Sequence, residues 1–411
     1  MSQILFENAA LLDVARGERR PGTSVLVEGD RIAEVSDGTL RAPGARRIDL
    51  AGRTLMPGLI DAHVHAVLTT MDLAALEKKP VTLVANEARV VLEAMLRRGF
   101  TTVRDAGGAD WGLAQAVERG LIRGPRLFFS GRVLSQTGGH GDFSPREDAP
   151  RLCACSIRSS GFSHVADGVD AVRKAAREEL RRGAFQVKIM ASGGVASPTD
   201  PIWNLQYSPD EMRAIVEEAR GWRTYALAHA YTPEAIARAV RAGVRSIEHG
   251  NLIDTETAAL MAREGAFLVP TLVTYFKIEE LGRALGFPAV SQRKVKDVLD
   301  AGLASLEIAK AAGVAIGFGT DLLGETHPHQ NQEFAIRARV LSSAEILRSA
   351  TLVNAALLRR EGELGVVAAG ALADLLVVDG DPLADVTLLA EPGKNLSAVM
   401  KGGEFALDRL G

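Results

Sequence analysis

The feature of this sequence that most limits its fold is a long alternation of short apolar runs with longer amphipathic stretches. The apolar runs, typical of buried strands, lie at residues 59–65, 101–105, 127–130, 185–190, 224–229, 244–249, 267–271 and 314–320. Helical periodicity marks residues 170–182, 209–221, 233–242 and 255–264. This alternation predicts an α/β fold with a parallel sheet. It favours a closed (β/α)8 barrel, although an open doubly wound sheet has the same local pattern.

The segments on either side of this region have the character of β-strands. Runs at residues 24–28 and 31–35 flank the dipeptide 29–30, which predicts a tight hairpin. Similar runs occur at residues 47–50 and 54–56, and again at residues 373–379 and 397–400. A β-rich beginning and a β-rich end around one α/β region predict a small domain built from both termini.

Composition and charge exclude several classes of protein. The chain is 47% hydrophobic and 24% charged, a balance typical of globular domains, and its net charge of −3 provides no global field for nucleic acid or an anionic membrane. Cys153 and Cys155 are too few for a disulfide framework, so we expect reduced thiols and a cytoplasmic protein. The first residues do not resemble a signal peptide, and no apolar run reaches the ~18 residues of a membrane-spanning helix.

Five of the expected strands end in side chains that can bind a metal ion. His63 and His65 alternate along one strand, so both imidazoles face the same side. The other candidates are Lys188, His229, His249 and Asp321. Carboxyl ends of parallel strands meet at one end of a barrel, where barrel enzymes have their active sites. Imidazoles and carboxylates without cysteine suit a catalytic Zn2+ site, and also Mn2+, Co2+ or Fe2+.

Lys188 is the unusual member of this group, because it lies inside the apolar run 185–190. An unpaired buried ammonium is costly, so its side chain either reaches solvent at the strand end or loses its charge. Reaction with CO2 would convert the amine into a carbamate, an anion whose two oxygens can bridge two cations.

Two further residues are candidates for substrate contact. His140 lies in the glycine-rich segment TGGHGD, and Tyr231 follows His229 by two positions. Connections longer than a barrel needs are expected as loops at residues 131–168, 193–208 and 272–292, at the same end as the metal ligands. The sequence assigns no role to the remaining histidines, His164, His327 and His329.

Five motifs, in this order, resemble the amidohydrolase superfamily: PGLIDAHVH, QVKIMASGG, ALAHAY, SIEHGN and GFGTD. The chain is most similar to the imidazolonepropionase-related group, which includes Xaa-Pro dipeptidases and ochratoxin-type amidohydrolases. The segments GDRIAEV and GALADLLVVDGDPL resemble its composite β domain. The resemblance implies a (β/α)8 TIM barrel at residues 58–357 and a small β-sandwich domain from residues 1–57 and 358–411.

The resemblance also implies a binuclear metal site. His63, His65 and Asp321 would hold one divalent ion, His229 and His249 the other, and carboxylated Lys188 would bridge both. We expect Zn2+ in both positions. His140 and Tyr231 match positions that contact the substrate in this group.

The expected activity is hydrolysis of the amide bond of an Xaa-Pro dipeptide or an ochratoxin-like N-acyl amino acid through a metal-bridging hydroxide. Asp321 would pass a proton from the hydroxide to the leaving nitrogen, and His140 would help stabilise the oxyanion. The same site could instead hydrolyse a cyclic amide, as imidazolonepropionase does, or a lactone, a carbamate or an organophosphate ester. The third hypothesis is that the protein is a catalytically inactive barrel with a binding or structural role. We expect a small-molecule substrate with a free carboxylate, and a homo-oligomer.

Overall fold

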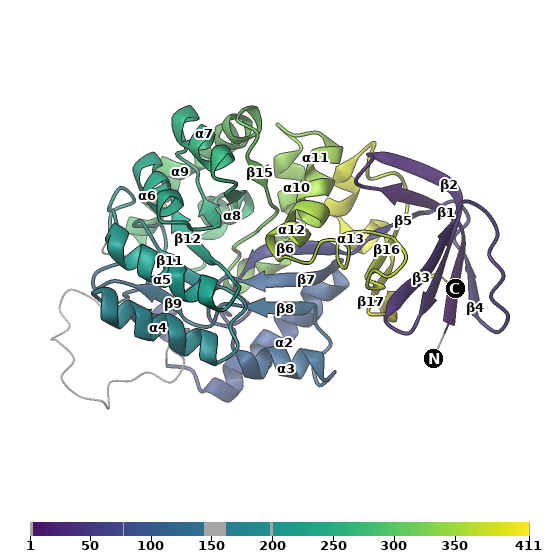
Figure 1. Ribbon diagram of the computed structural model, residues 1–411, viewed down its shortest axis with the longest axis horizontal. Coiled ribbons are helices and arrows are strands. Elements are labelled where there is room, and N and C mark those ends of the chain that lie inside the picture. The colour runs from purple at the N-terminus through teal and green to yellow at the C-terminus, as the bar shows by residue number, and fades with distance from the viewer. Residues whose placement is uncertain (1–2, 77, 144–161, 198–199, 411) are drawn as a thin grey trace.

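The computed structural model of the 411-residue chain describes residues 3–76, 78–143, 162–197 and 200–410. Figure 1 shows a larger part, in which helices surround strands, beside a smaller part made of strands from both termini. The predicted thiols Cys153 and Cys155, and the middle of the connection predicted at residues 131–168, lie outside the described residues.

The strands of the larger part pair in parallel throughout. One sheet has the order β6-β7-β8 and the other the order β10-β9-β11-β12-β13-β14-β15. Their bounds are β6 (Leu59–Val64), β7 (Phe100–Asp105), β8 (Arg126–Phe129), β9 (Val133–Ser135), β10 (Ser163–Val165), β11 (Val187–Met190), β12 (Ala226–Ala230), β13 (Ser246–His249), β14 (Phe267–Val269) and β15 (Ala315–Ile316). The carboxyl ends of these strands therefore point the same way, as the sequence predicts.

Backbone hydrogen bonds connect the two sheets at both sides. On one side, the amide of Phe185 donates to the carbonyl of Phe129 at 2.9 Å. On the other, the amide of Ala62 in β6 donates to the carbonyl of Phe318, just beyond β15, at 2.8 Å. The first and last parallel strands thus lie next to each other, although they are far apart in the sequence.

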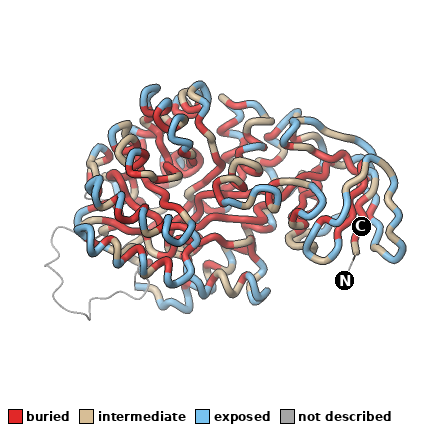
Figure 2. Tube along the Cα trace, viewed as in Figure 1, coloured by how far each residue is buried: buried red, intermediate tan, exposed pale blue. Residues whose placement is uncertain are grey.

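Helices cover the outside of these sheets. They are α1 (Leu73–Leu76), α2 (Val81–Arg97), α3 (Trp111–Glu118), α4 (Val169–Arg181), α5 (Pro209–Gly221), α6 (Pro233–Arg241), α7 (Thr255–Arg263), α8 (Leu272–Leu281), α9 (Ala289–Ala311), α10 (Gln332–Arg337), α11 (Ser343–Arg348), α12 (Asn354–Leu357) and α13 (Pro392–Asn395). Ser208 caps α5 and Thr232 caps α6, and a proline occupies the first turn of each. The four helices predicted between strands are present to within about one residue at each end. In Figure 2 the central strands are buried and the outer faces of the helices are exposed.

The prediction of a loop at residues 272–292 is wrong, because α8 occupies residues 272–281 and α9 begins at Ala289. Helix α8 has the sequence LVTYFKIEEL, and its buried side chains include Val273, Thr274 and Tyr275 in succession. A helix that is buried on more than one side lacks the one-sided apolar periodicity by which surface helices are found.

The smaller part is a mixed sheet with the order β18-β17-β16-β5-β1-β2-β3, with β4 also paired to β1. Its bounds are β1 (Gln3–Asp13), β2 (Glu18–Glu28), β3 (Arg31–Ser36), β4 (Arg46–Asp49), β5 (Thr54–Pro57), β16 (Leu375–Val378), β17 (Leu396–Lys401) and β18 (Glu404–Asp408). The predicted hairpin is present, with Glu28 opposite Arg31. Strand β5 pairs with both β1 and β16, so it joins the two terminal segments in one sheet. No described helix is long and apolar enough to cross a membrane.

Candidate active site

His63 and His65 lie at the carboxyl end of β6, and both are buried. The Nδ1 atom of His63 is 2.6 Å from the carboxylate of Glu248, and the Nδ1 atom of His65 is 2.9 Å from the carbonyl oxygen of Gly107. These acceptors keep a ring hydrogen on each Nδ1, so in the neutral imidazoles the ligand atom would be Nε2. Both Nε2 atoms face Asp321, whose Oδ1 atom is 3.4 Å from His63 and 3.1 Å from His65.

His249 and Asp321 bring two more ligands to the same point. His249 ends β13, Asp321 follows β15, and one ligand atom from each lies within 4.8 Å of the others and of His63. Both residues have positive φ, 74° and 52° respectively, which is uncommon outside glycine and typical of functional sites. Burial would raise the pKa of Asp321, but His63 and His65 outweigh it and hold that pKa well below its ordinary value. Asp321 is therefore an ionised acceptor.

His229, at the end of β12, lies between other aromatic rings of the site. Its ring stacks on that of His140 with centroids 4.3 Å apart, and lies 4.6 Å from His249 and 4.9 Å from Tyr231. Burial, together with neighbouring cationic groups, lowers the pKa of His229 well below its ordinary value, and burial does the same for His249. Both rings are therefore neutral, the state in which imidazole binds metals.

Lys188 lies on β11 with only 1% of its surface exposed, so it does not reach solvent. No hydrogen bond or ion pair joins its ammonium to another residue of the described part of the chain. Burial lowers the pKa of Lys188 to about 8, although Glu248 and Asp321 oppose this effect. A buried amine of reduced basicity is the form that can react with CO2.

All eight residues predicted for the site line one cavity: His63, His65, His140, Lys188, His229, Tyr231, His249 and Asp321. One wall of this cavity is apolar, and it includes Leu68, Phe162, Met190, Val195 and Ile278. The other three histidines do not line it. His327 is buried and its Nε2 atom is 3.1 Å from the carbonyl oxygen of Leu68, while His329 contacts Gln332 and His164 is half-buried.

His140, which the sequence predicts as a substrate contact in a glycine-rich segment, is only 7% exposed. Its amide donates to the side chain of Gln206 at 2.8 Å, and its Nδ1 atom is 2.8 Å from the Ser197 hydroxyl. The carboxylate of Asp200 lies 3.4 Å from the same nitrogen. The connection after β11, predicted as a functional loop, thus holds His140 against His229.

This connection is fixed in turn by α9. The Nζ atom of Lys294 donates to the carbonyl oxygens of Gly194, Ser197 and Asp200, at 2.9, 2.8 and 2.5 Å. Three backbone carbonyl groups of this connection thus share one ammonium as their donor.

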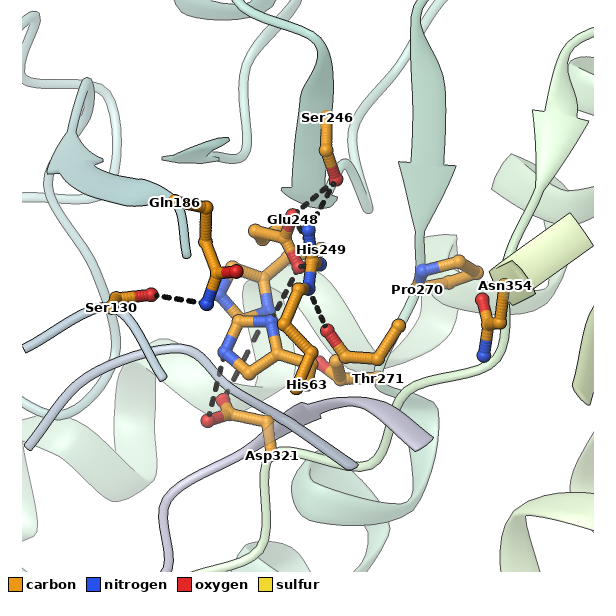
Figure 3. Close-up of polar contacts among 12 residues, drawn as sticks. His63, Ser130, Gln186, Ser246, Glu248, His249, Pro270, Thr271, Asp321 and Asn354 are labelled. Carbon is orange, nitrogen blue, oxygen red and sulfur yellow. Dashed lines mark hydrogen bonds and ion pairs between the residues drawn. The ribbon is translucent and has the colours of Figure 1, made fainter. Parts of the chain in front are cut away.

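Sequence reasoning missed the residues beneath and beside the candidate ligands. Arg104 and Glu248 form a buried ion pair under His63, and Figure 3 shows Ser246 donating to the same carboxylate. Thr271 contacts His249, and Tyr275 contacts Tyr231. A charged residue directly before His249 in an apolar strand was a signal that could have revealed Glu248. Tyr275 had no such signal, because it belongs to the helix that was predicted as a loop, and Thr271 had none because it is the last residue of the run predicted as a strand at residues 267–271.

Comparison with known proteins agrees with this geometry. The amidohydrolase family model matches residues 54–406. Ochratoxinase of Aspergillus niger is 33% identical over 363 residues, which cover 85% of this chain and 75% of that protein. A crystal structure of an amidohydrolase is 54% identical, covers 100% of both chains and has a TM-score of 0.98. A prolidase in complex with N-methylphosphonate-L-proline is 52% identical over 98% of this chain and 99% of that one, with a TM-score of 0.96. The chain is therefore a hydrolase and belongs to the amidohydrolase family.

Proposed function

We propose that this hydrolase uses two divalent metal ions to cleave the amide bond of a dipeptide or N-acyl amino acid, with Xaa-Pro dipeptides as the first substrate class. The observation that carries the proposal is the convergence of six side chains with nitrogen or oxygen donors on one cavity. The 52% identical prolidase, which holds a proline derivative, supports the choice of proline as the leaving group.

The donors fit the proposed metals. The Nε2 atom of His63 is buried without a hydrogen-bond partner among the described residues, as expected of an atom whose partner is a cation. His63, His65 and Asp321 would hold one Zn2+ and His229 and His249 the other, with carboxylated Lys188 between them. Two such ions supply Lewis acidity, which activates water and polarises a carbonyl group.

The protein's own side chains transfer the proton and bind the substrate. Asp321 is ionised and faces the cavity, so it accepts the proton of the attacking water and transfers it to the leaving nitrogen. Amide nitrogen is a poor leaving group without this proton. His140 and Tyr231 line the same cavity as Asp321. The ring N–H of His140 is the proposed donor to the carbonyl oxygen of the substrate, and the O–H of Tyr231 is the proposed donor to its free carboxylate. The apolar wall keeps water away from the acyl group.

The fold that we propose around this site is a closed (β/α)8 barrel at residues 58–357, with a small β-sandwich domain from residues 1–57 and 358–411. The hydrogen bond from Ala62 to Phe318 supports closure of the barrel, and the pairing of β5 with β1 and β16 supports a domain of two terminal segments. A cytoplasmic location and a homo-oligomeric state stay predictions.

A second candidate is hydrolysis of an N-acyl amino acid with a bulky acyl group, which the likeness to ochratoxinase favours. A panel of Xaa-Pro, Xaa-Arg and N-acyl-Phe substrates, assayed with Zn2+-loaded protein, separates the two. Each compound is tested as the free acid and as the C-terminal amide. Asp321→Asn protein, expressed and purified in the same way, controls for contaminating hydrolases. We expect hydrolysis of the acids and inhibition by N-methylphosphonate-L-proline. If none of these amides is hydrolysed by the Zn2+-loaded protein, the proposal is contradicted.

A further inference from the structure

A row of hydroxyl groups leads from His249 into the cavity. The Nδ1 atom of His249 is 2.8 Å from the hydroxyl oxygen of Thr271 (Figure 3). The hydroxyl groups of Tyr231 and Tyr275 are 2.8 Å apart. Thr271 immediately precedes α8 and Tyr275 lies one helical turn later, so their side chains are neighbours on one side of the helix. All four residues are buried, so water does not compete for these bonds.

The direction of these hydrogen bonds depends on the metal. If Nε2 of His249 binds a cation, the ring hydrogen is on Nδ1 and is donated to Thr271. The Thr271 hydroxyl then has its own hydrogen left for Tyr275, and Tyr275 in turn donates to Tyr231. The O–H of Tyr231 has no acceptor left within the row and is directed to a ligand. In the opposite direction Thr271 would donate to Nδ1, and a neutral ring would carry its hydrogen on Nε2, where it blocks metal binding.

The hydroxyl groups of Thr271, Tyr275 and Tyr231 can all take part in this row of hydrogen bonds. The Thr271 side chain makes no capping hydrogen bond at the start of α8. Burial raises the pKa of Tyr231 and that of Tyr275, so both hydroxyls keep their hydrogens. Both tyrosines also line the cavity beside Asp321.

We propose that Thr271 and Tyr275 are positioning residues, which couple metal binding at His249 to the orientation of the Tyr231 hydroxyl as a donor to the substrate. The identity of the ligand rests on the proposed function: the acceptor would be an anionic oxygen of a proline-type substrate or inhibitor. The coupling between Thr271 and the metal does not depend on that identity.

The first experiment measures Zn2+ affinity by competition with a chelator, without substrate. Thr271→Val keeps the shape of the side chain but removes the hydroxyl, and should weaken the more weakly held Zn2+ by ~10–100-fold. Thr271→Ser retains the hydroxyl and should bind Zn2+ as the wild type does. Equal affinity of Thr271→Val and wild type would overturn the proposal, whatever the substrate proves to be.

The second experiment measures the Kd of N-methylphosphonate-L-proline by calorimetry on Zn2+-loaded proteins. Tyr231→Phe should weaken binding by ~10–100-fold, because one hydrogen bond to a charged oxygen is lost. In a Tyr275→Phe background the Tyr231 hydroxyl is no longer held as a donor, so the same substitution should cost less than about threefold. Tyr207→Phe removes a buried hydroxyl outside the cavity and is the matched control.

Equal losses from Tyr231→Phe in both backgrounds would contradict the coupling. If wild-type protein does not bind this inhibitor, the proposed proline specificity fails, and the Zn2+ measurements then decide on the hydroxyl row by themselves.

Discussion

Arg104 and Glu248 form a fully buried ion pair beneath the cavity, with Nη2 of Arg104 2.8 Å from each carboxylate oxygen of Glu248. The same carboxylate accepts the ring hydrogen of His63 at 2.6 Å. Burial would raise the pKa of Glu248, but Arg104 and His63 outweigh it and hold that pKa well below its ordinary value. One ionised carboxylate thus fixes the ring of a proposed metal ligand.

Glu248→Gln should strongly destabilise the protein. The substitution keeps the size of the side chain but leaves the guanidinium of Arg104 buried without a counter-charge, which typically costs about 3–5 kcal/mol. Denaturant unfolding of the metal-free protein measures this loss. Glu217→Gln, which removes an exposed partner of Arg173, is the control and should leave the free energy of unfolding unchanged. A Glu248→Gln variant as stable as this control would mean that the ion pair makes no net contribution.

Lys188→Ala should lose most of the bound metal and the activity, because the bridging anion cannot form. Added short-chain carboxylic acids should restore part of both, since they can occupy the space of the missing side chain. Full metal content without such acids would refute the carbamate.

The carbamate also predicts a pH dependence in the metal-free protein. Burial lowers the pKa of Lys188 to about 8, so the neutral amine predominates above that pH and the ammonium below it. Only the neutral amine attacks CO2. At equal dissolved ¹³CO2, the carbamate NMR signal should therefore be stronger at about pH 9 than at about pH 7, and absent from Lys188→Ala. A signal that does not change with pH would show that Lys188 is not the site.

Much of this architecture could be predicted from the sequence, because the information is local. Eight of the ten described parallel strands lie on short apolar runs, whereas β9 and β10 lie within the connection predicted as a loop at residues 131–168. Helices such as α5 begin at a capping serine followed by proline. The five motifs predicted the superfamily, which the match of residues 54–406 confirms. Their common position at strand ends also predicted that His63, Lys188 and Asp321 would line one cavity, as they do.

What the sequence did not reveal depends on contacts between distant segments. Helix α8 is buried on several sides, so it has no amphipathic pattern, and its Tyr275 was missed with it. Nothing in TGGHGD indicates that Ser197 and Gln206, more than fifty residues away, hold His140 in place. Partners of this kind are determined by the fold as a whole.

Asp321→Asn should keep most of its metal, because the amide oxygen remains a ligand, but it cannot accept a proton. The expected loss in kcat is a factor of about 10²–10⁴, as is typical of acid–base groups. Steady-state kinetics and metal analysis on the same sample test this. Turnover close to that of wild type would remove Asp321 from the proton path.

Lys294→Met should impair substrate binding without removing the metals. The three carbonyl oxygens of the loop at Gly194, Ser197 and Asp200 would lose their shared donor, while the metal ligands lie on strands that the substitution does not touch. His140 depends on Ser197 for its orientation, so kcat/KM should fall about tenfold, the effect expected from losing hydrogen bonds to a charged group. Cleavage of the loop by added protease should also become faster.

The matched control is Lys296→Met, which removes an exposed lysine two positions further along the same helix. It should leave kcat/KM and the rate of proteolysis as in wild type, and both variants should contain as much Zn2+ as wild type. If Lys294→Met behaves like this control, the hydrogen bonds from Lys294 to the loop do not matter for catalysis. If it loses Zn2+ as well, the loop supports the metal site itself, and the effect on kcat/KM cannot be assigned to His140.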